Sequence, residues 1–159
     1  MNFTIKDLIK QALIAAIYLV LVIIFWEFSF KEIQFRIAEI LLILIFFDKK
    51  SIIGLTLGVI IANFFSPLLL FDLTFGVLAS ILSFFVLLLL KRWPYLALVF
   101  PALINGFIIG LGLAIIYELP YFITILTVFI GEFLVVYGLG LPLYYLLKRY
   151  HFEEVFNKL

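Results

Sequence analysis

The sequence contains no cysteine and only one histidine, His151. The lack of cysteine excludes disulfides, thiolate chemistry and cysteine-based metal sites. Because His151 follows the last long apolar stretch, no histidine-based metal site or general base can form within the apolar segments. The sequence also has no phosphate-binding loop of the G-x-x-x-x-G-K type and no serine in a recognisable nucleophile motif. We therefore predict that the chain is not an enzyme and that it holds no metal and no cofactor.

Charge is also scarce. Only 13% of the residues are charged, whereas 67% are hydrophobic and 19% are aromatic. A water-soluble protein of this length could not bury so much apolar surface in one core, so its solvent must be a lipid bilayer. The formal net charge of +1 gives no indication of nucleic-acid binding. We predict a multi-pass protein of the cell membrane that contacts lipid and no nucleic acid.

Long apolar runs dominate what is present. They lack the alternation of a membrane β-barrel and are long enough for helices, with breaks where proline and charge cluster. The first run continues to the polar Glu27 without a small-residue cleavage site, so we interpret it as a spanning helix rather than a signal peptide. The sequence therefore predicts an all-α bundle of six transmembrane helices in a single domain, 1–159. The predicted helices cover residues 8–26, 33–47, 51–65, 73–90, 95–117 and 121–147.

The basic residues predict the orientation of this bundle. With the N-terminus placed in the cytoplasm, the outer side holds only Lys31 and Arg36. The inner side then collects Lys6, Lys10, Lys49, Lys50, Lys91, Arg92, Lys148, Arg149 and Lys158. Such a bias follows the positive-inside rule, so both termini are predicted to be cytoplasmic.

Several strongly polar residues fall within or beside the apolar runs. On this topology most of them lie in the outer half of the membrane or near its midplane. This predicts a pocket that opens to the outside, closed below by an inner half that holds few polar residues. Asn63 ends the third predicted helix and Asp72 begins the fourth. The six predicted substrate-binding residues are Arg36, Glu39, Asn63, Asp72, Asn105 and Glu132.

Each of these polar residues also has a purely structural interpretation. Glu32, Arg36 and Glu39 are spaced to share one helix face. There Arg36 and Glu39 can form an ion pair that fixes the helix, can contact a ligand, or can do both if Arg36 orients Glu39. Glu132 has no neutralising partner in its own helix and follows Gly131, which favours a ligand contact. Asn105 is equally suited to an interhelical hydrogen bond and to ligand binding.

Small residues recur at a spacing of four in three helices. The pairs are Ala12/Ala16, Gly54/Gly58 and Gly106/Gly110. This spacing is typical of close helix packing in membranes and by itself is weakly specific.

The stretches "IQFRIAEILLIL", "GLTLGVIIANFFSP" and "FDLTFGVLAS" resemble the QueT family over residues 28–132. Its members are substrate-capturing S components of energy-coupling factor (ECF) transporters in the bacterial plasma membrane. The resemblance implies a transmembrane coupling protein and two cytoplasmic ATPases as partners, with Ala12 and Ala16 contacting the coupling protein. It also implies a queuosine precursor as the ligand, a 7-deazaguanine such as preQ1 or preQ0. The stretch "SPLLLFD" departs from the family pattern because it has no glycine.

The polar residues suit such a ligand. A carboxylate can accept hydrogen bonds from both donors of a guanine-like edge, and an arginine or an amide can donate to its carbonyl. Two alternatives of different kinds stay open. The first is an S component for another small vitamin-like molecule. The second is a solitary proton-coupled carrier or a small membrane enzyme, suggested by Glu39 and Glu132 at membrane depth.

Overall fold

The computed structural model describes residues 3–30 and 35–158, and within these ranges it is all-helical. The first half contains α1 (Ile5–Ile24), α2 (Trp26–Ser29), the 3-10 helix η1 (Ile37–Ile43), α3 (Leu44–Phe47), α4 (Ser51–Asn63), α5 (Leu69–Phe71), the π-helical segment η2 (Asp72–Gly76) and α6 (Val77–Leu89). The second half contains α7 (Pro94–Ala97), α8 (Val99–Asn105), the π-helical η3 (Gly106–Gly110), α9 (Leu111–Ile116), α10 (Tyr121–Phe133), the π-helical η4 (Leu134–Leu139), α11 (Gly140–Arg149) and α12 (Phe152–Lys158).

Local sequence explains where several helices begin. Thr4 caps α1, because its side chain accepts from the Asp7 backbone N–H while the Asp7 carboxylate accepts from the Thr4 backbone N–H. Pro94 opens α7 as its first residue, and Pro120 directly precedes α10. Proline is favoured at such positions because it lacks the N–H that the first helical turn leaves unpaired.

Several of these elements join into longer continuous helices. In the described residues, four helices are long and apolar enough to cross a membrane: α1 (Ile5–Ile24) and the continuous helices Leu69–Leu89, Pro94–Ile116 and Tyr121–Arg149. The other two predicted spans correspond to shorter apolar helices, Ile37–Phe47 and Ser51–Asn63. The count of six spans and the cytoplasmic location of the termini stay predictions.

The second predicted helix begins later than expected. The sequence predicts a start at residue 33, but η1 begins at Ile37, and Arg36 is a non-helical residue with φ −81° and ψ 83°. The backbone N–H of Phe35 donates to the carbonyl of Phe28 instead of joining a helical turn. Arg36 therefore precedes the helix and does not share its face with Glu39, while Glu32 lies outside the described residues.

The fourth predicted helix begins earlier than expected. Helical structure starts at Leu69, so Asp72 lies within a continuous helix and does not open it. Asn63 does end α4, as the sequence predicts.

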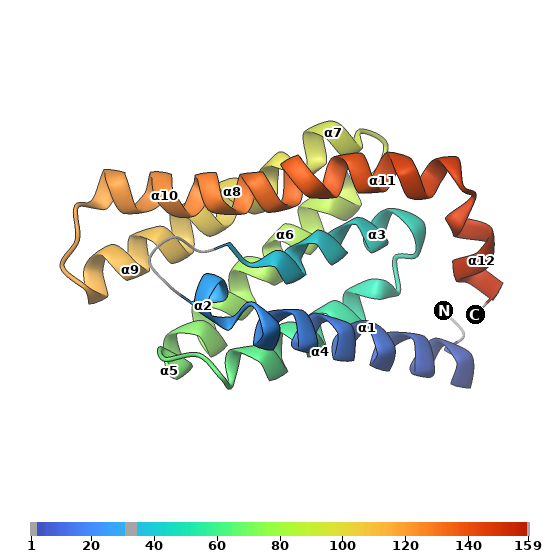
Figure 1. Cartoon of the computed structure of the whole chain (residues 1–159), viewed down its shortest axis with the longest axis horizontal. Helices are drawn as coiled ribbons and strands as arrows, with labels where there is room; N and C mark the ends of the chain where they lie inside the picture. Colours follow the sequence, from blue (N-terminus) through green and yellow to red (C-terminus); the bar gives the residue numbers. More distant parts are fainter. Residues whose placement is uncertain (1–2, 31–34, 159) are drawn as a thin grey trace.

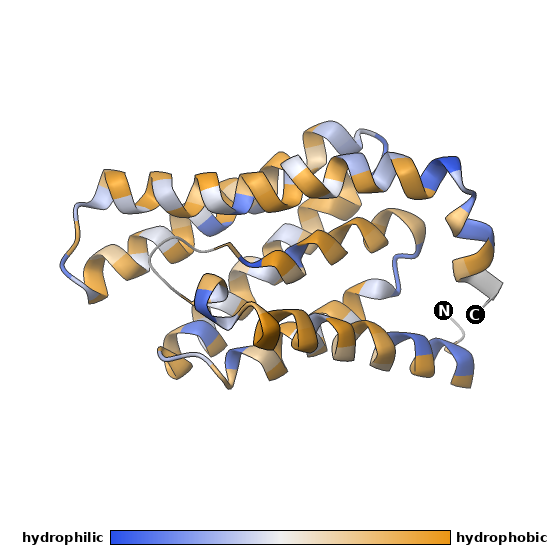
Figure 2. Ribbon diagram, in the orientation of Figure 1, coloured by the Kyte–Doolittle hydropathy of each residue, from blue (hydrophilic) through white to orange (hydrophobic). Residues whose placement is uncertain are grey.

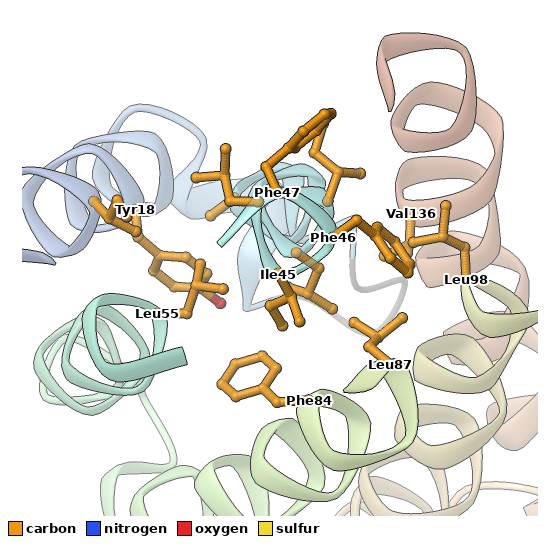
Figure 3. Close-up of a cluster of buried hydrophobic side chains, with 14 of the residues drawn as sticks. Tyr18, Ile45, Phe46, Phe47, Leu55, Phe84, Leu87, Leu98 and Val136 are labelled. Carbon is orange, nitrogen blue, oxygen red and sulfur yellow. The ribbon is translucent and has the colours of Figure 1, made fainter. Parts of the chain in front are cut away.

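The short segment formed by η1 and α3 lies at the centre of the molecule. It contacts α1, α4, α6, η4 and α11, which run beside it along the long axis (Figure 1). All residues from Leu42 to Phe47 are buried. Around α3, Figure 3 shows the side chains of Tyr18, Leu55, Phe84, Leu87, Leu98 and Val136. Because its neighbours shield it from lipid, the second half of this short segment is fully buried, whereas Ile37, Ile40 and Leu41 in its first half are half-buried.

Hydrophilic residues gather at one end of the long axis, where α1 begins and α11 ends (Figure 2). At this end Lys10 forms an ion pair with Asp48 at 3.1 Å, and Lys50 forms one with Asp7 at 2.7 Å. The Lys10 ammonium also donates to the carbonyl of Phe156 at 3.0 Å, which ties α12 to α1. The start of α1, the turn after α3 and the end of the chain are thus held together.

Two of the three small-residue pairs serve packing inside the bundle. A β-carbon at Gly54 would lie 2.6 Å from the Gln11 carbonyl oxygen, and one at Gly58 would lie 2.8 Å from the β-carbon of Tyr18. Gly106 and Gly110 approach α10 in the same manner. Ala12 and Ala16, by contrast, are exposed on the outer face of α1.

The close approach of α1 and α4 predicts that Gly54→Ala destabilises the protein. The added β-carbon meets backbone that cannot move aside, and overpacking of this kind costs about 1–3 kcal/mol. Gly138→Ala is the matched control because a β-carbon there meets nothing within 4 Å. Thermal unfolding in detergent should show a lower melting temperature for Gly54→Ala only. Equal melting temperatures would contradict the packing described.

Candidate functional site

All six predicted substrate-binding residues are buried. Their exposed fractions run from 1% for Glu39 and Asn63 to 8% for Asn105. Tyr18, which has no exposed surface, belongs with them by its contacts. We call these seven residues the polar cluster: Tyr18, Arg36, Glu39, Asn63, Asp72, Asn105 and Glu132. A charge inside a membrane costs at least about 2.5–3.5 kcal/mol on insertion scales, so such groups need partners.

Arg36 is the common electrostatic partner of the three carboxylates of the cluster. Its guanidinium interacts electrostatically with Glu39, Asp72 and Glu132. These residues come from η1, η2 and α10. The fold therefore brings three carboxylates toward one cation in the interior.

Glu39 has a direct partner that the sequence did not suggest. The Tyr18 hydroxyl donates to Glu39 Oε1 at 2.7 Å. No carboxylate of the described residues lies within the 4 Å of an ion pair from Arg36, so the structure does not show the ion pair with Glu39 that was one of the two interpretations. Tyr18 lies four residues after the buried Ile14 on the inward face of α1, and this periodicity was the available sign of its orientation.

Glu132 is held by the amide of Asn105. Asn105 Nδ2 donates to Glu132 Oε1 at 3.1 Å, which links α8 to α10. Both interpretations of Asn105 are therefore compatible, because an amide that joins two helices also orients a buried carboxylate.

Asp72 is fixed by two residues that lie before it in the chain. Ser66 Oγ donates to Asp72 Oδ2 and itself accepts from the backbone N–H of Leu68 at 2.9 Å. Asn63 Nδ2 donates to the Asp72 carbonyl at 2.7 Å. Gly76 leaves room for this arrangement, since a β-carbon there would lie 3.1 Å from Asn63 Nδ2.

Each of the three long helices that carries Asp72, Asn105 or Glu132 contains a π-helical segment beside that residue. Asp72 begins η2, Asn105 directly precedes η3, and Glu132 lies two residues before η4. Wider turns of this kind are frequent at functional sites. Their positions support a functional interpretation of the same residues.

A helical membrane protein whose interior holds acids, amides and a guanidinium is suited to bind a small polar molecule within the bilayer. The sequence model of the QueT transporter family matches residues 8–149. The queuosine precursor transporter QueT of Lactococcus lactis subsp. cremoris (strain MG1363) is 34% identical over 144 residues, which cover 80% of this chain and 83% of that protein. No solved structure matches.

These findings place the chain among multi-pass membrane transport proteins. Within that class, the chain belongs to the QueT transporter family. The resemblance identified from the sequence is thus confirmed. Both matches are to transporters, which speaks against the alternative of a small membrane enzyme.

The contact between Tyr18 and Glu39 predicts that Tyr18→Phe destabilises the empty protein. Removal of the hydroxyl leaves a buried carboxylate oxygen without its donor, a loss of about 1–3 kcal/mol. Tyr121→Phe is the control, since Tyr121 is 59% exposed. Thermal unfolding should separate the two variants, and unchanged melting of Tyr18→Phe would show that the hydroxyl contributes nothing.

Proposed function

We propose that this chain is the substrate-capturing S component of an ECF transporter and that it binds a queuosine precursor, a 7-deazaguanine such as preQ1 or preQ0. The observation that carries the proposal is the polar cluster, buried within a chain of the QueT transporter family. The queuosine precursor transporter of L. lactis supports the choice of ligand by its name and its similarity.

The chemistry of the cluster complements a guanine-like base. Such a base presents a carbonyl acceptor beside ring and exocyclic N–H donors, which match a guanidinium and carboxylates respectively. Tyr18 donates to one carboxylate oxygen of Glu39, and Asn105 donates to one carboxylate oxygen of Glu132. Both carboxylates are therefore oriented before a ligand arrives. Preorganisation of this kind lowers the entropic cost of binding. Adenine should bind poorly, because its edge reverses the donor and acceptor pattern and leaves buried groups unpaired.

The proposal includes six membrane spans with both termini in the cytoplasm. The basic residues support this orientation, since those of α1 and of the turn after α3 lie at the same end of the bundle. A pocket at the cluster would then open toward the outside.

We further propose that the outer face of α1 docks on the transmembrane coupling protein, which two cytoplasmic ATPases energise. Ala12 and Ala16 are exposed on this face, whereas the glycine pairs of α4 and of η3 are used inside the bundle. Small side chains let a partner helix approach closely, so this pair is free to serve an external partner.

Isosteric changes of the two buried glutamates test the binding site. Glu39→Gln and Glu132→Gln keep an acceptor oxygen for Tyr18 and Asn105 but replace the other oxygen with a donor. Binding of preQ1, measured by calorimetry, should weaken more than about tenfold, in line with the roughly 1–3 kcal/mol of one base-edge contact. The melting temperature of the empty protein should barely move.

Glu118→Gln is the control for this experiment, because Glu118 is exposed. If both buried variants bind preQ1 as the wild type does, the two glutamates hold helices together and the binding site lies elsewhere. If the protein binds no deazapurine but binds a different vitamin-like molecule tightly, the choice of substrate is wrong.

Ala12→Leu and Ala16→Leu test the coupling face. The added bulk should prevent close helix approach and abolish co-purification with the coupling protein while preQ1 binding is retained. Thr74→Leu is the control on another exposed surface, since the Thr74 hydroxyl bonds only to carbonyls of its own helix among the described residues. Normal assembly of the alanine variants would contradict the proposed face.

Reconstitution of this chain alone in liposomes tests the alternative of a solitary carrier. Gradient-driven uptake by such liposomes would favour that alternative.

A further inference from the structure

Two charged atoms of the polar cluster lack a hydrogen-bond partner among the described residues. Arg36 Nη2 and Asp72 Oδ1 are both buried without one, in side chains that are 6% and 3% exposed. A buried donor or acceptor that stays unpaired is costly, and the cost is larger for a charged group. In native proteins such atoms are therefore nearly always paired, with the protein, with a ligand or with ordered water.

The two side chains attract each other without touching. Arg36 interacts electrostatically with Asp72, yet they do not form an ion pair within 4 Å in the part of the chain that the structure describes. Each is held by other groups. The Arg36 guanidinium lies 5.6 Å from the centre of the Phe30 ring, and Asp72 is fixed through Ser66 and Asn63. Direct contact would satisfy both free atoms, so their separation leaves a donor and an acceptor for a third group.

We propose that Arg36 and Asp72 together bind the lactam edge of the ligand, which is a ring carbonyl next to a ring N–H. The carbonyl accepts from Arg36 Nη2 and the N–H donates to Asp72 Oδ1. This assignment rests on the proposed function, and it adds which side chains determine specificity for the oxo form of the base. An anion would satisfy Arg36 only, and a cation would satisfy Asp72 only. A lactam satisfies both.

The supports of Asp72 make the assignment testable by a change of specificity. Ser66 Oγ donates to Asp72 Oδ2, so in Asp72→Asn the amide oxygen should stay with Ser66. The amide NH₂ then takes the position of the free Oδ1. The variant would present a donor where the wild type presents an acceptor.

Three deazapurine probes distinguish the edges of the base. 7-Deazaguanine has the lactam and a 2-amino group, 7-deazahypoxanthine has the lactam only, and 7-deaza-2-aminopurine has no carbonyl and a ring nitrogen that accepts. Calorimetry should show that Asp72→Asn loses about ten- to a hundredfold in affinity for both lactams. Its relative affinity for 7-deaza-2-aminopurine should rise, because the new amide can donate to that nitrogen.

The outcomes separate this inference from the proposed function. If the wild type binds none of the three probes, the proposed deazaguanine ligand is wrong. The wild type could bind 7-deazaguanine while Asp72→Asn lowers the affinity for all three probes equally, or for none of them. In that case water, and not the ligand, contacts Arg36 and Asp72. Glu118→Gln should match the wild type throughout.

A second variant covers the case in which Asp72→Asn does not fold. Arg36→Lys keeps the charge but loses the planar donor geometry. It should weaken binding of 7-deazaguanine and 7-deazahypoxanthine more than that of 7-deaza-2-aminopurine, which has no carbonyl for it to contact. An equal loss for all three would count against a contact between Arg36 and the carbonyl.

Discussion

The interior of this membrane protein contains three carboxylates and a guanidinium, and the cost of burying them constrains the rest of the structure. Glu39, Asp72 and Glu132 are each at most 3% exposed, and Arg36 is 6% exposed. Burial of ions in a medium of low dielectric is unfavourable unless hydrogen bonds and opposite charges compensate. The hydrogen bonds to these carboxylates come from several parts of the chain: a tyrosine from α1, a serine that follows α4, and an asparagine from α8. Each polar contact therefore also fixes the position of one helix against another.

Close packing of the backbone supports these contacts. Gly58 of α4 allows the β-carbon of Tyr18 to approach, and this places the tyrosine hydroxyl beside Glu39 of the central segment. The same α1 exposes Ala12 and Ala16 on its opposite face. One helix thus carries a residue of the polar cluster and the face proposed for the coupling protein. The proposed binding site and the proposed coupling face therefore share one helix.

The sequence predicted the helical class and the burial of the polar residues, because long apolar runs span lipid as helices and the isolated acids within them must face the protein interior. The sequence could not predict the non-helical conformation of Arg36. The residue before it, Phe35, donates a backbone hydrogen bond to the carbonyl of Phe28, and this contact depends on how α2 is placed. Tyr18 was missed because an aromatic residue in an apolar run is usually part of the packing surface. The pairing of Glu132 with Asn105 joins residues that are 27 positions apart, and such contacts depend on the tertiary fold.

A structure of the protein with bound preQ1 tests most directly whether the polar cluster binds the ligand. We expect the base to lie among Arg36, Asp72 and Glu132, with its carbonyl toward Arg36. A ligand located instead in the apolar groove between α2 and η4, which Phe28, Phe35 and Leu134 line, would contradict this expectation. In that case the cluster would be a structural element that holds the helices together.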